Sequence, residues 1–212
     1  DKSRRERDAL LPSVSMLMTK IIGLTGGIAS GKSTVTKIIR ESGFKVIDAD
    51  QVVHKLQAKG GKLYQALLEW LGHEILDADG ELDRPKLSQM IFANPDNMKT
   101  SARLQNSIIR QELACQRDQL KQTEEIFFVD IPLLIEEKYI KWFDEIWLVF
   151  VDKEKQLQRL MARNNYSREE AELRLSHQMP LTDKKSFASL IINNNGDLIT
   201  LKEQILDALQ RL

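Results

Sequence analysis

The sequence predicts an α/β protein whose five-stranded parallel sheet carries helices on both faces. Five short runs, rich in apolar and β-branched residues, have the length of buried strands, at 20–25, 44–48, 126–130, 145–151 and 188–192. Segments with helical spacing of apolar residues separate most of these runs, and this alternation favours a parallel sheet. A glycine-rich turn directly follows the first run and leads into a helical segment. These observations predict one medium-sized α/β domain, or such a core with a substantial insertion.

The glycine-rich turn matches the phosphate-loop pattern G-x-x-x-x-G-K-S/T at every fixed position, and a strand and a helix flank it as the pattern requires. Glycines let the backbone approach phosphate oxygens, while successive N–H groups and the helix N-terminus attract anions. Lys32 is expected to reach the β- and γ-phosphates, and the Ser33 hydroxyl is expected to hold Mg²⁺. The predicted nucleotide contacts in this loop are Gly27, Ile28, Ala29, Ser30, Gly31, Lys32, Ser33 and Thr34. The alternative, a glycine turn that only starts a helix, fits the complete pattern less well, so the sequence predicts binding of a nucleoside triphosphate.

The composition argues against several classes of function. Lys plus Arg and Asp plus Glu number 31 each, so the formal net charge is zero and there is no bulk electrostatic case for binding nucleic acid or membrane. No apolar run approaches the length of a membrane span. The single cysteine, Cys115, forms no intrachain disulfide, and the three histidines lack zinc-type spacing. The single cysteine favours a reducing cytosol, so we expect a cytoplasmic protein. We also expect small-molecule partners, and a monomer or a weak oligomer.

The first 17 residues are charged and show no periodic pattern. Their longest apolar stretch is too short for the core of a signal peptide. We expect them to be a disordered tail or a remnant of expression engineering, with Met18 as the natural start.

Two aspartates, Asp48 and Asp50, close the second predicted strand. In open α/β sheets, ligands bind beyond the carboxyl ends of the strands. If extended backbone continues through Ala49, both carboxylates lie on one side, and at least one is expected to face the triphosphate. The alternative for each is to cap the helix that follows.

Residues 51–125 contain no convincing strand and are expected to be helical. Residues 83–85, Asp-Arg-Pro, have the pattern of a helix start, and a long amphipathic helix is predicted over about residues 97–122. The segment is far longer than a crossover between parallel strands needs. We expect it to provide a place for a second substrate.

The third strand ends in Asp130, after four apolar residues. This is a Walker B-type pattern, which places a carboxylate near Mg²⁺, although apolar runs that end in aspartate are common in other proteins too. Glu136 follows closely, and three roles remain open for it: contact with substrate, pairing with a Lys or Arg, or capping of a turn.

A charged helical region is predicted over residues 153–178. Arg159 and Arg163 are four residues apart and therefore share a helix face, where they are suited to clamp phosphates. The same region contains Arg168 and Arg174. The alternative for most of these arginines is a solvated helix surface.

The last predicted strand is followed by the turn Asn193–Gly196 and a closing amphipathic helix from Asp197. The turn is the expected place of adenine contacts, with Asn195 as a predicted ATP-binding residue. The apolar residues expected to point inwards from the helix are Leu201, Ile205, Leu206 and Leu209.

Several of these motifs together resemble the dephospho-coenzyme A kinase family. The resemblance is carried by residues 23–33, 46–50 and 132–136, with the turn 193–196 similar to the family's closing motif. It extends from about Met18 to Leu212 in the same order and spacing. It implies a three-layer phosphate-loop NTPase fold and ATP-dependent phosphorylation of the ribose 3′-hydroxyl of dephospho-coenzyme A, with Mg²⁺.

The resemblance also implies a division of the chain and a set of residue roles. It assigns a nucleotide-binding core to 18–50, 126–152 and 181–212, a coenzyme A-binding helical domain to 51–125, and a mobile lid to 153–180. We call residues 153–180 the lid segment. The implied catalytic residues are Asp50, as general base, with Lys32 and Arg159. The implied substrate contacts are Asp50, Arg84, Glu136 and Arg163, and the implied metal ligands are Ser33 and Asp130.

This chain departs from the family pattern at several positions. Asn106-Ser107 stands where many members have His-Pro, and Asn193 where many have aspartate. Ala29 replaces the usual glycine, and its methyl group is tolerable only if the residue avoids positive φ.

Two other functions fit a phosphate loop. One is another nucleoside or nucleotide kinase, which a substrate screen distinguishes. The other is a nucleotide switch or motor protein, for which slow hydrolysis without an acceptor is expected. The absence of an N-K-x-D motif from the sequence argues against a GTPase switch.

Overall fold

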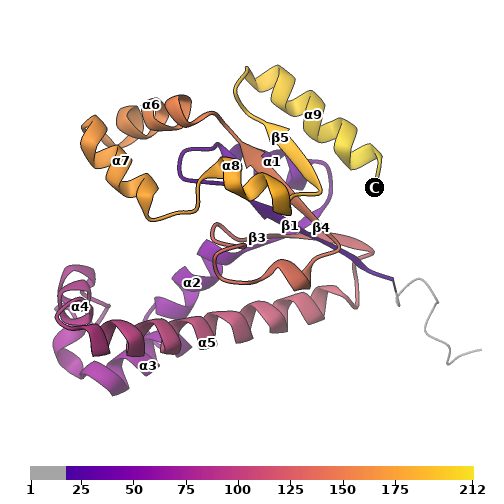
Figure 1. Cartoon of the computed structure of the whole chain (residues 1–212). Helices are drawn as coiled ribbons and strands as arrows, with labels where there is room; N and C mark the ends of the chain where they lie inside the picture. The colour runs from indigo at the N-terminus through magenta and orange to yellow at the C-terminus, as the bar shows by residue number, and fades with distance from the viewer. Residues whose placement is uncertain (1–17) are drawn as a thin grey trace, which may run out of the picture. The chain divides into compact units, whose positions relative to one another are not determined.

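The computed structural model describes residues 18–212, so the predictions made for residues 1–17 lie outside the described part of the chain. The chain divides into two compact units. We call residues 18–47 and 120–212 the sheet unit, and residues 48–119 the helical unit (Figure 1).

The predicted α/β fold is confirmed. The strands are β1 Lys20–Thr25, β2 Lys45–Asp48, β3 Ile126–Asp130, β4 Glu145–Phe150 and β5 Leu190–Asn193. They form one sheet in the order β2-β3-β1-β4-β5, and β1 pairs in parallel with both β3 and β4. The register places Leu24 opposite Asp130, so the carboxyl ends of the two central strands meet at the same edge of the sheet.

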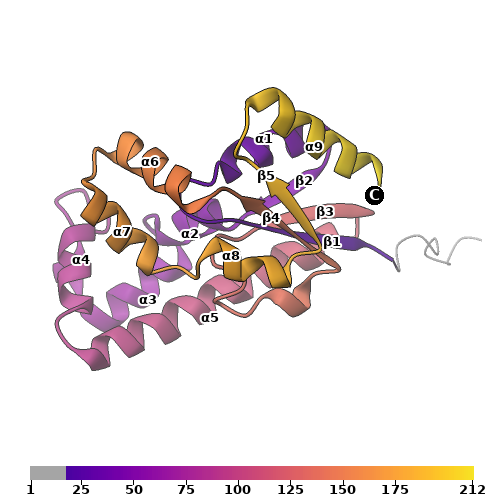
Figure 2. The ribbon, with the colours of Figure 1, turned by 45° about the horizontal axis from the view of Figure 1, so that its top comes forward.

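Both faces of the sheet are covered, as the apolar runs predict. α1 (Lys32–Glu41) and α9 (Leu198–Gln210) lie side by side on one face, where they bury Ile22, Trp147 and their neighbours (Figures 1 and 2). On β4, Leu148 and Phe150 alternate with these residues and pack instead with Leu181 of α8 (Leu181–Lys184). Leu206 was predicted to point inwards from α9, but its side chain is 38% exposed, so that prediction is wrong.

The helical unit contains four α-helices among its described residues. They are α2 Ala49–Gln57, α3 Lys62–Leu71, α4 Arg84–Ile91 and α5 Pro95–Leu120. The last residue of α5, Leu120, is the first residue of the second segment of the sheet unit. The Asp83 side chain accepts a hydrogen bond from the Lys86 N–H, and a proline lies in the first turn, as the sequence predicts. The long helix spans 95–120 instead of 97–122. Besides these helices there is a short 3-10 helix, His73–Ile75, and an isolated bridge between Leu76 and Leu82.

The lid segment contains two helices, α6 (Lys153–Asn164) and α7 (Arg168–Ser176). Asn165 adopts a left-handed conformation (φ 54°), which ends α6. Ser167 and Glu170 then form a reciprocal capping box at the start of α7. The predicted helical region is therefore interrupted by local chemistry that the charge pattern does not reveal. Three short 3-10 helices complete the described elements, namely the one in the helical unit, Ile140–Trp142 and Lys185–Phe187. No helix among residues 18–212 is long and apolar enough to cross a membrane.

Candidate active site

The phosphate loop connects β1 to α1 at the centre of the sheet. Gly31 has φ 85°, and a Cβ atom there would overlap the Asn194 side-chain amide, so this position requires glycine on two grounds. The Ser30 N–H bonds the Gly27 carbonyl at 3.1 Å, which closes the turn. No acidic residue lies in the first turn of α1, so nothing there opposes the attraction of the helix N-terminus for an anion.

Ala29 has φ 58° and so lies in the left-handed region. The sequence argument made its methyl group acceptable only at negative φ, and the structure does not meet that condition. For a residue with a Cβ atom this conformation costs about 1–2 kcal/mol. Ala29 packs against a buried cluster of the lid segment, formed by Leu157, Leu160 and Ala171, and this contact helps to hold the strained conformation.

Lys32 forms an ion pair with Asp130, at the point where β1 and β3 end together. Thr36, one turn further along α1, donates its hydroxyl to the other Asp130 oxygen at 3.1 Å. Asp130 is buried, while the Lys32 side chain is 14% exposed. The Lys32 ammonium group is thus held beside the loop by Asp130, which also accepts the hydrogen bond from Thr36.

The Ser33 hydroxyl lies on the first turn of α1, and Ser33 is exposed. Together, Ser33 and Asp130 offer a hydroxyl and a carboxylate oxygen, the hard donors that Mg²⁺ prefers, and such ions usually keep waters and phosphate oxygens as their other ligands. The pair therefore fits Mg²⁺ in its chemistry. No cluster of three or more His, Cys, Asp or Glu side chains suited to a metal occurs among the described residues.

Four side chains outside the motif hold the backbone of the phosphate loop. The Ile28 N–H donates to Gln178 Oε1 at 3.0 Å, and Gln156 Nε2 donates to the Ile28 carbonyl at 2.7 Å. Asn194 Nδ2 donates to the Ser30 carbonyl at 2.8 Å, and Lys184 Nζ to the Gly26 carbonyl at 3.3 Å. Apart from Asn194, which belongs to the predicted turn, sequence reasoning missed these residues, because isolated Gln and Lys residues carry no motif.

Lys184 is fully buried, and its partner is Glu136 at 3.2 Å. Glu136 Oε2 also accepts a hydrogen bond from the Met179 N–H at 3.4 Å. Of the three roles left open for Glu136, pairing with a lysine is thus observed. Its Oε1 atom is buried and has no hydrogen-bond partner among the described residues, so its predicted role in substrate binding stays a prediction.

The turn after β5 is bonded to the start of the lid segment. Arg159 is half-buried and donates to the Asn194 carbonyl at 2.9 Å, and Asn195 Oδ1 accepts from the Asp152 N–H at 2.8 Å. Lys155 also donates to the Asn195 carbonyl. Since Asn194 in turn holds the phosphate loop, Arg159 is connected to the loop through one intermediate residue.

The other arginines of the lid segment differ from Arg159. Arg163 is exposed and donates to Asn164 at 2.8 Å. Arg168 pairs with Glu154 at 2.9 Å, and this hydrogen bond and charge lower the pKa of Glu154 and raise the pKa of Arg168. Arg174 stacks over the Tyr166 ring at 5.5 Å. For Arg168 and Arg174 the structure favours the alternative of a surface role.

In the helical unit, the helix α2 already begins at Ala49, so extended backbone does not continue to Asp50 as the shared-side argument required. Asp48 caps this helix by accepting from the Asp50 and Gln51 N–H groups. The Asp50 carboxylate is exposed on the first turn. Arg84 is exposed too, and donates to Gln57 Oε1 at 3.1 Å.

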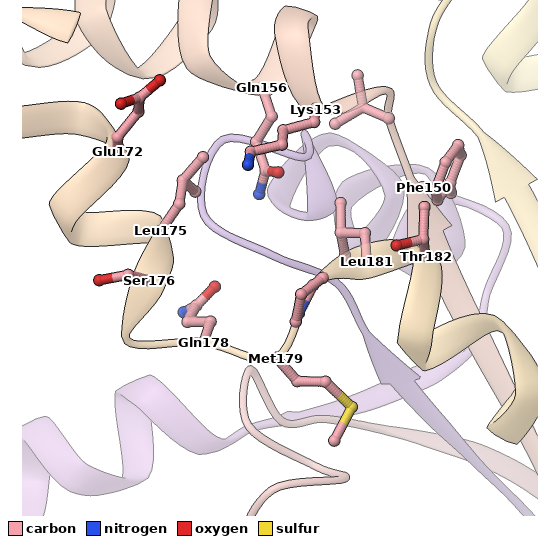
Figure 3. A pocket seen from close by; sticks show the side chains of 12 residues that line it. Phe150, Lys153, Gln156, Glu172, Leu175, Ser176, Gln178, Met179, Leu181 and Thr182 are labelled. Carbon is pink, nitrogen blue, oxygen red and sulfur yellow. The ribbon is translucent and has the colours of Figure 1, made fainter. Parts of the chain in front are cut away.

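A cavity of about 310 Å³ lies between the lid segment and the end of β4 (Figure 3). Phe150, Met179 and Leu181 supply apolar walls, and Gln156 and Gln178 border it where they reach the phosphate loop. None of the predicted ATP-binding residues lines this cavity. The cavity is therefore bordered by Gln156 and Gln178, which bond the phosphate loop, and not by the predicted ATP-binding residues themselves.

A family model described as dephospho-CoA kinase matches residues 20–200. The chain belongs to the dephospho-CoA kinase family. A dephospho-CoA kinase from Streptococcus agalactiae is 98% identical over 195 residues, which cover 92% of this chain and 100% of that protein. One from Streptococcus mutans is 62% identical and covers 92% and 98%.

Solved structures agree with this family. The structure of a dephospho-CoA kinase from Campylobacter jejuni is 28% identical, with a TM-score of 0.71, over 92% of this chain and 97% of that one. The resemblance stated from the sequence is confirmed, as are the phosphate-loop fold and the ATP-using kinase class. The alternative of another nucleoside or nucleotide kinase is not favoured.

Proposed function

We propose that this protein transfers the γ-phosphoryl group of ATP to the ribose 3′-hydroxyl of dephospho-coenzyme A, giving coenzyme A and ADP, the last step of coenzyme A synthesis. The observation that carries the proposal is the junction of β1, the phosphate loop and α1, with Lys32 held by Asp130 where a triphosphate would bind. Membership in the dephospho-CoA kinase family supplies the acceptor. We expect the protein to be cytoplasmic, because a single cysteine is typical of a reducing compartment, and to be a monomer or a weak oligomer.

In this reaction the protein contributes mainly position and charge. Donors at the start of α1 hold the triphosphate, and the Lys32 ammonium offsets charge that develops on the transferred group. Arg159, fixed to the turn after β5, is proposed to add a second positive charge, with Arg163 as a further phosphate or substrate contact. Mg²⁺, held by Ser33 and Asp130, would supply charge neutralisation when bound.

Asp50 is the proposed general base, which accepts the proton of the 3′-hydroxyl, and Arg84 and Glu136 are proposed substrate contacts. The exposure of the Asp50 carboxylate supports this role, because a base must be reachable by the substrate. Asp48 is less suited to it, since its oxygen already caps α2.

The function is tested by measuring ADP formation by the purified protein with Mg²⁺ and ATP, with and without dephospho-coenzyme A. We expect ADP to form at a substantial rate only with the acceptor, and the product to be phosphorylated at the 3′ position. ATP binding without acceptor-dependent turnover would contradict the assignment of the acceptor.

The base is tested by Asp50→Asn, for which we expect kcat to fall about 10²–10⁴-fold while ATP affinity is kept. Asp48→Asn is the matched control, because asparagine removes a charge two residues away but still caps a helix. Steady-state kinetics of both variants separate the two carboxylates. Unchanged turnover in the Asp50 variant would exclude it as the base.

A further inference from the structure

The tip of the phosphate loop is embedded in the lid segment. The two backbone polar groups of Ile28 bond two glutamines, the N–H to Gln178 at 3.0 Å and the carbonyl to Gln156 at 2.7 Å. Gln156 comes from α6 and is only 6% exposed, whereas Gln178 lies in the linker between α7 and α8 and is half-buried. Figure 3 shows both side chains beside the loop, on separate parts of the lid segment.

The chemistry of the backbone fixes the orientation of both side-chain amides. An N–H group only donates, so Gln178 must present its oxygen, and a carbonyl only accepts, so Gln156 must present its nitrogen. The N–H belongs to the peptide group before Ile28 and the carbonyl to the one after it, so the two glutamines fix two successive peptide groups of the loop. Neither glutamine can satisfy the other backbone group without turning over its own amide.

Apolar contacts reinforce these bonds. Ile28 and Ala29 pack against a buried cluster of the lid segment formed by Leu157, Leu160 and Ala171. Ala29 directly follows the clamped residue and has the strained φ of 58°. A strained conformation persists when its surroundings over-determine it, and here the surroundings are the lid segment.

We infer that Gln156 and Gln178 are positioning residues, which hold the phosphate loop in its triphosphate-binding conformation and couple that conformation to the lid segment. Ile28 then belongs to the support of the loop instead of its direct phosphate donors, because both its backbone groups are already bonded. The inference rests on the proposed binding of ATP at this loop. It does not require either glutamine to touch a substrate.

The experiment compares Gln156→Met and Gln178→Met, which keep the length of the side chain and remove its hydrogen bonds. The readouts are kcat, the KM values for ATP and dephospho-coenzyme A, the calorimetric affinity for ATP without acceptor, and the melting temperature. We expect KM and Kd for ATP to rise about tenfold in each variant, the size of one lost hydrogen bond to a group left unsatisfied. The KM for dephospho-coenzyme A should stay unchanged. The control is Gln158→Met, an exposed residue of the same helix, which should behave as the unmodified protein.

ATP affinities equal to that of the Gln158 variant would overturn the inference. So would equal losses for both substrates together with a lowered melting temperature, since those indicate a general defect of folding. If Gln156→Met does not fold, the more accessible Gln178→Met decides alone. If the unmodified protein binds ATP but lacks acceptor-dependent turnover, the proposed function fails, yet the calorimetric comparison still tests the glutamines.

Discussion

The residues of the phosphate-loop motif and the residues that support the loop differ in exposure and in partners. Ser33 is exposed and Lys32 partly so, and both lie at the start of α1. By contrast, Gln156 and Lys184 are buried and lie more than 120 positions further along the chain. Each donates to one backbone carbonyl of the loop, and Lys184 also pairs with Glu136. Ser33 and Lys32, which are suited to meet a ligand, are therefore more accessible than Gln156 and Lys184, which hold the loop backbone.

This difference separates two kinds of contribution. A motif residue acts on the phosphates, so its loss should reduce catalysis more than stability. A buried charge in the support, such as the Lys184 ammonium, also acts on the stability of the fold, because an unpaired charge in the interior is costly. The predictions below test this separation, beginning with the largest expected effect.

Among the motif residues, we expect Lys32→Met to lower kcat about 10²–10³-fold and to weaken ATP binding. The reason is that the variant lacks the positive charge positioned beside the transferred phosphoryl group. Steady-state kinetics and calorimetry measure the two effects. Lys37→Met is the matched control: it removes a lysine from the same helix whose side chain is 76% exposed. Equal kcat values and ATP affinities for the two variants would show that Lys32 takes no part in the reaction.

For the supporting side we expect Glu136→Gln to lower the free energy of unfolding by about 3–5 kcal/mol, because it leaves the buried Lys184 ammonium without its counter-charge. Urea unfolding followed by circular dichroism measures this. Adding Lys184→Met to the same chain removes the uncompensated charge and should recover much of the loss. A double variant less stable than the single one would show that charge pairing is not the main contribution.

The sequence predicts the motif side of the site much better than its support. The phosphate loop and Asp130 follow from local patterns, since a glycine loop or an aspartate at a strand end carries its chemistry in adjacent residues. Gln156, Gln178 and Lys184 act through long-range contacts that no local pattern encodes. The helix start at Ala49 stayed open for a different reason, because either aspartate beside it could cap a helix and only the structure shows that Asp48 does.

Ala29 belongs to the phosphate-loop motif but packs against the lid segment, and its backbone is strained. We expect substitutions there to change stability less than Glu136→Gln does. We expect Ala29→Gly to alter the free energy of unfolding by less than about 1 kcal/mol, because relief of the left-handed strain is offset by greater freedom of the unfolded chain and a lost methyl contact. Ala29→Val should be clearly destabilised, since a β-branched residue at φ 58° is a strong outlier. Denaturant unfolding of the pair tests the conformation directly. Equal stability of the glycine and valine variants would mean that this residue does not hold a left-handed backbone.

The smallest effect is expected at the lid surface, where Glu154 and Arg168 form an ion pair with both side chains more than half exposed. Arg168 lowers the pKa of Glu154 in the folded protein, so the pair stabilises the fold above the ordinary glutamate pKa of 4.5 and loses its effect as the pH falls through the lowered value. Glu154→Gln should therefore melt slightly below the unmodified protein at neutral pH, and the difference should vanish in acid. It should also shrink with added salt, because solvent-exposed charges are screened. If the difference in melting temperature instead grew as the pH fell, the sign of this linkage would be reversed. Glu154 would then stabilise the protein through packing and not through its charge.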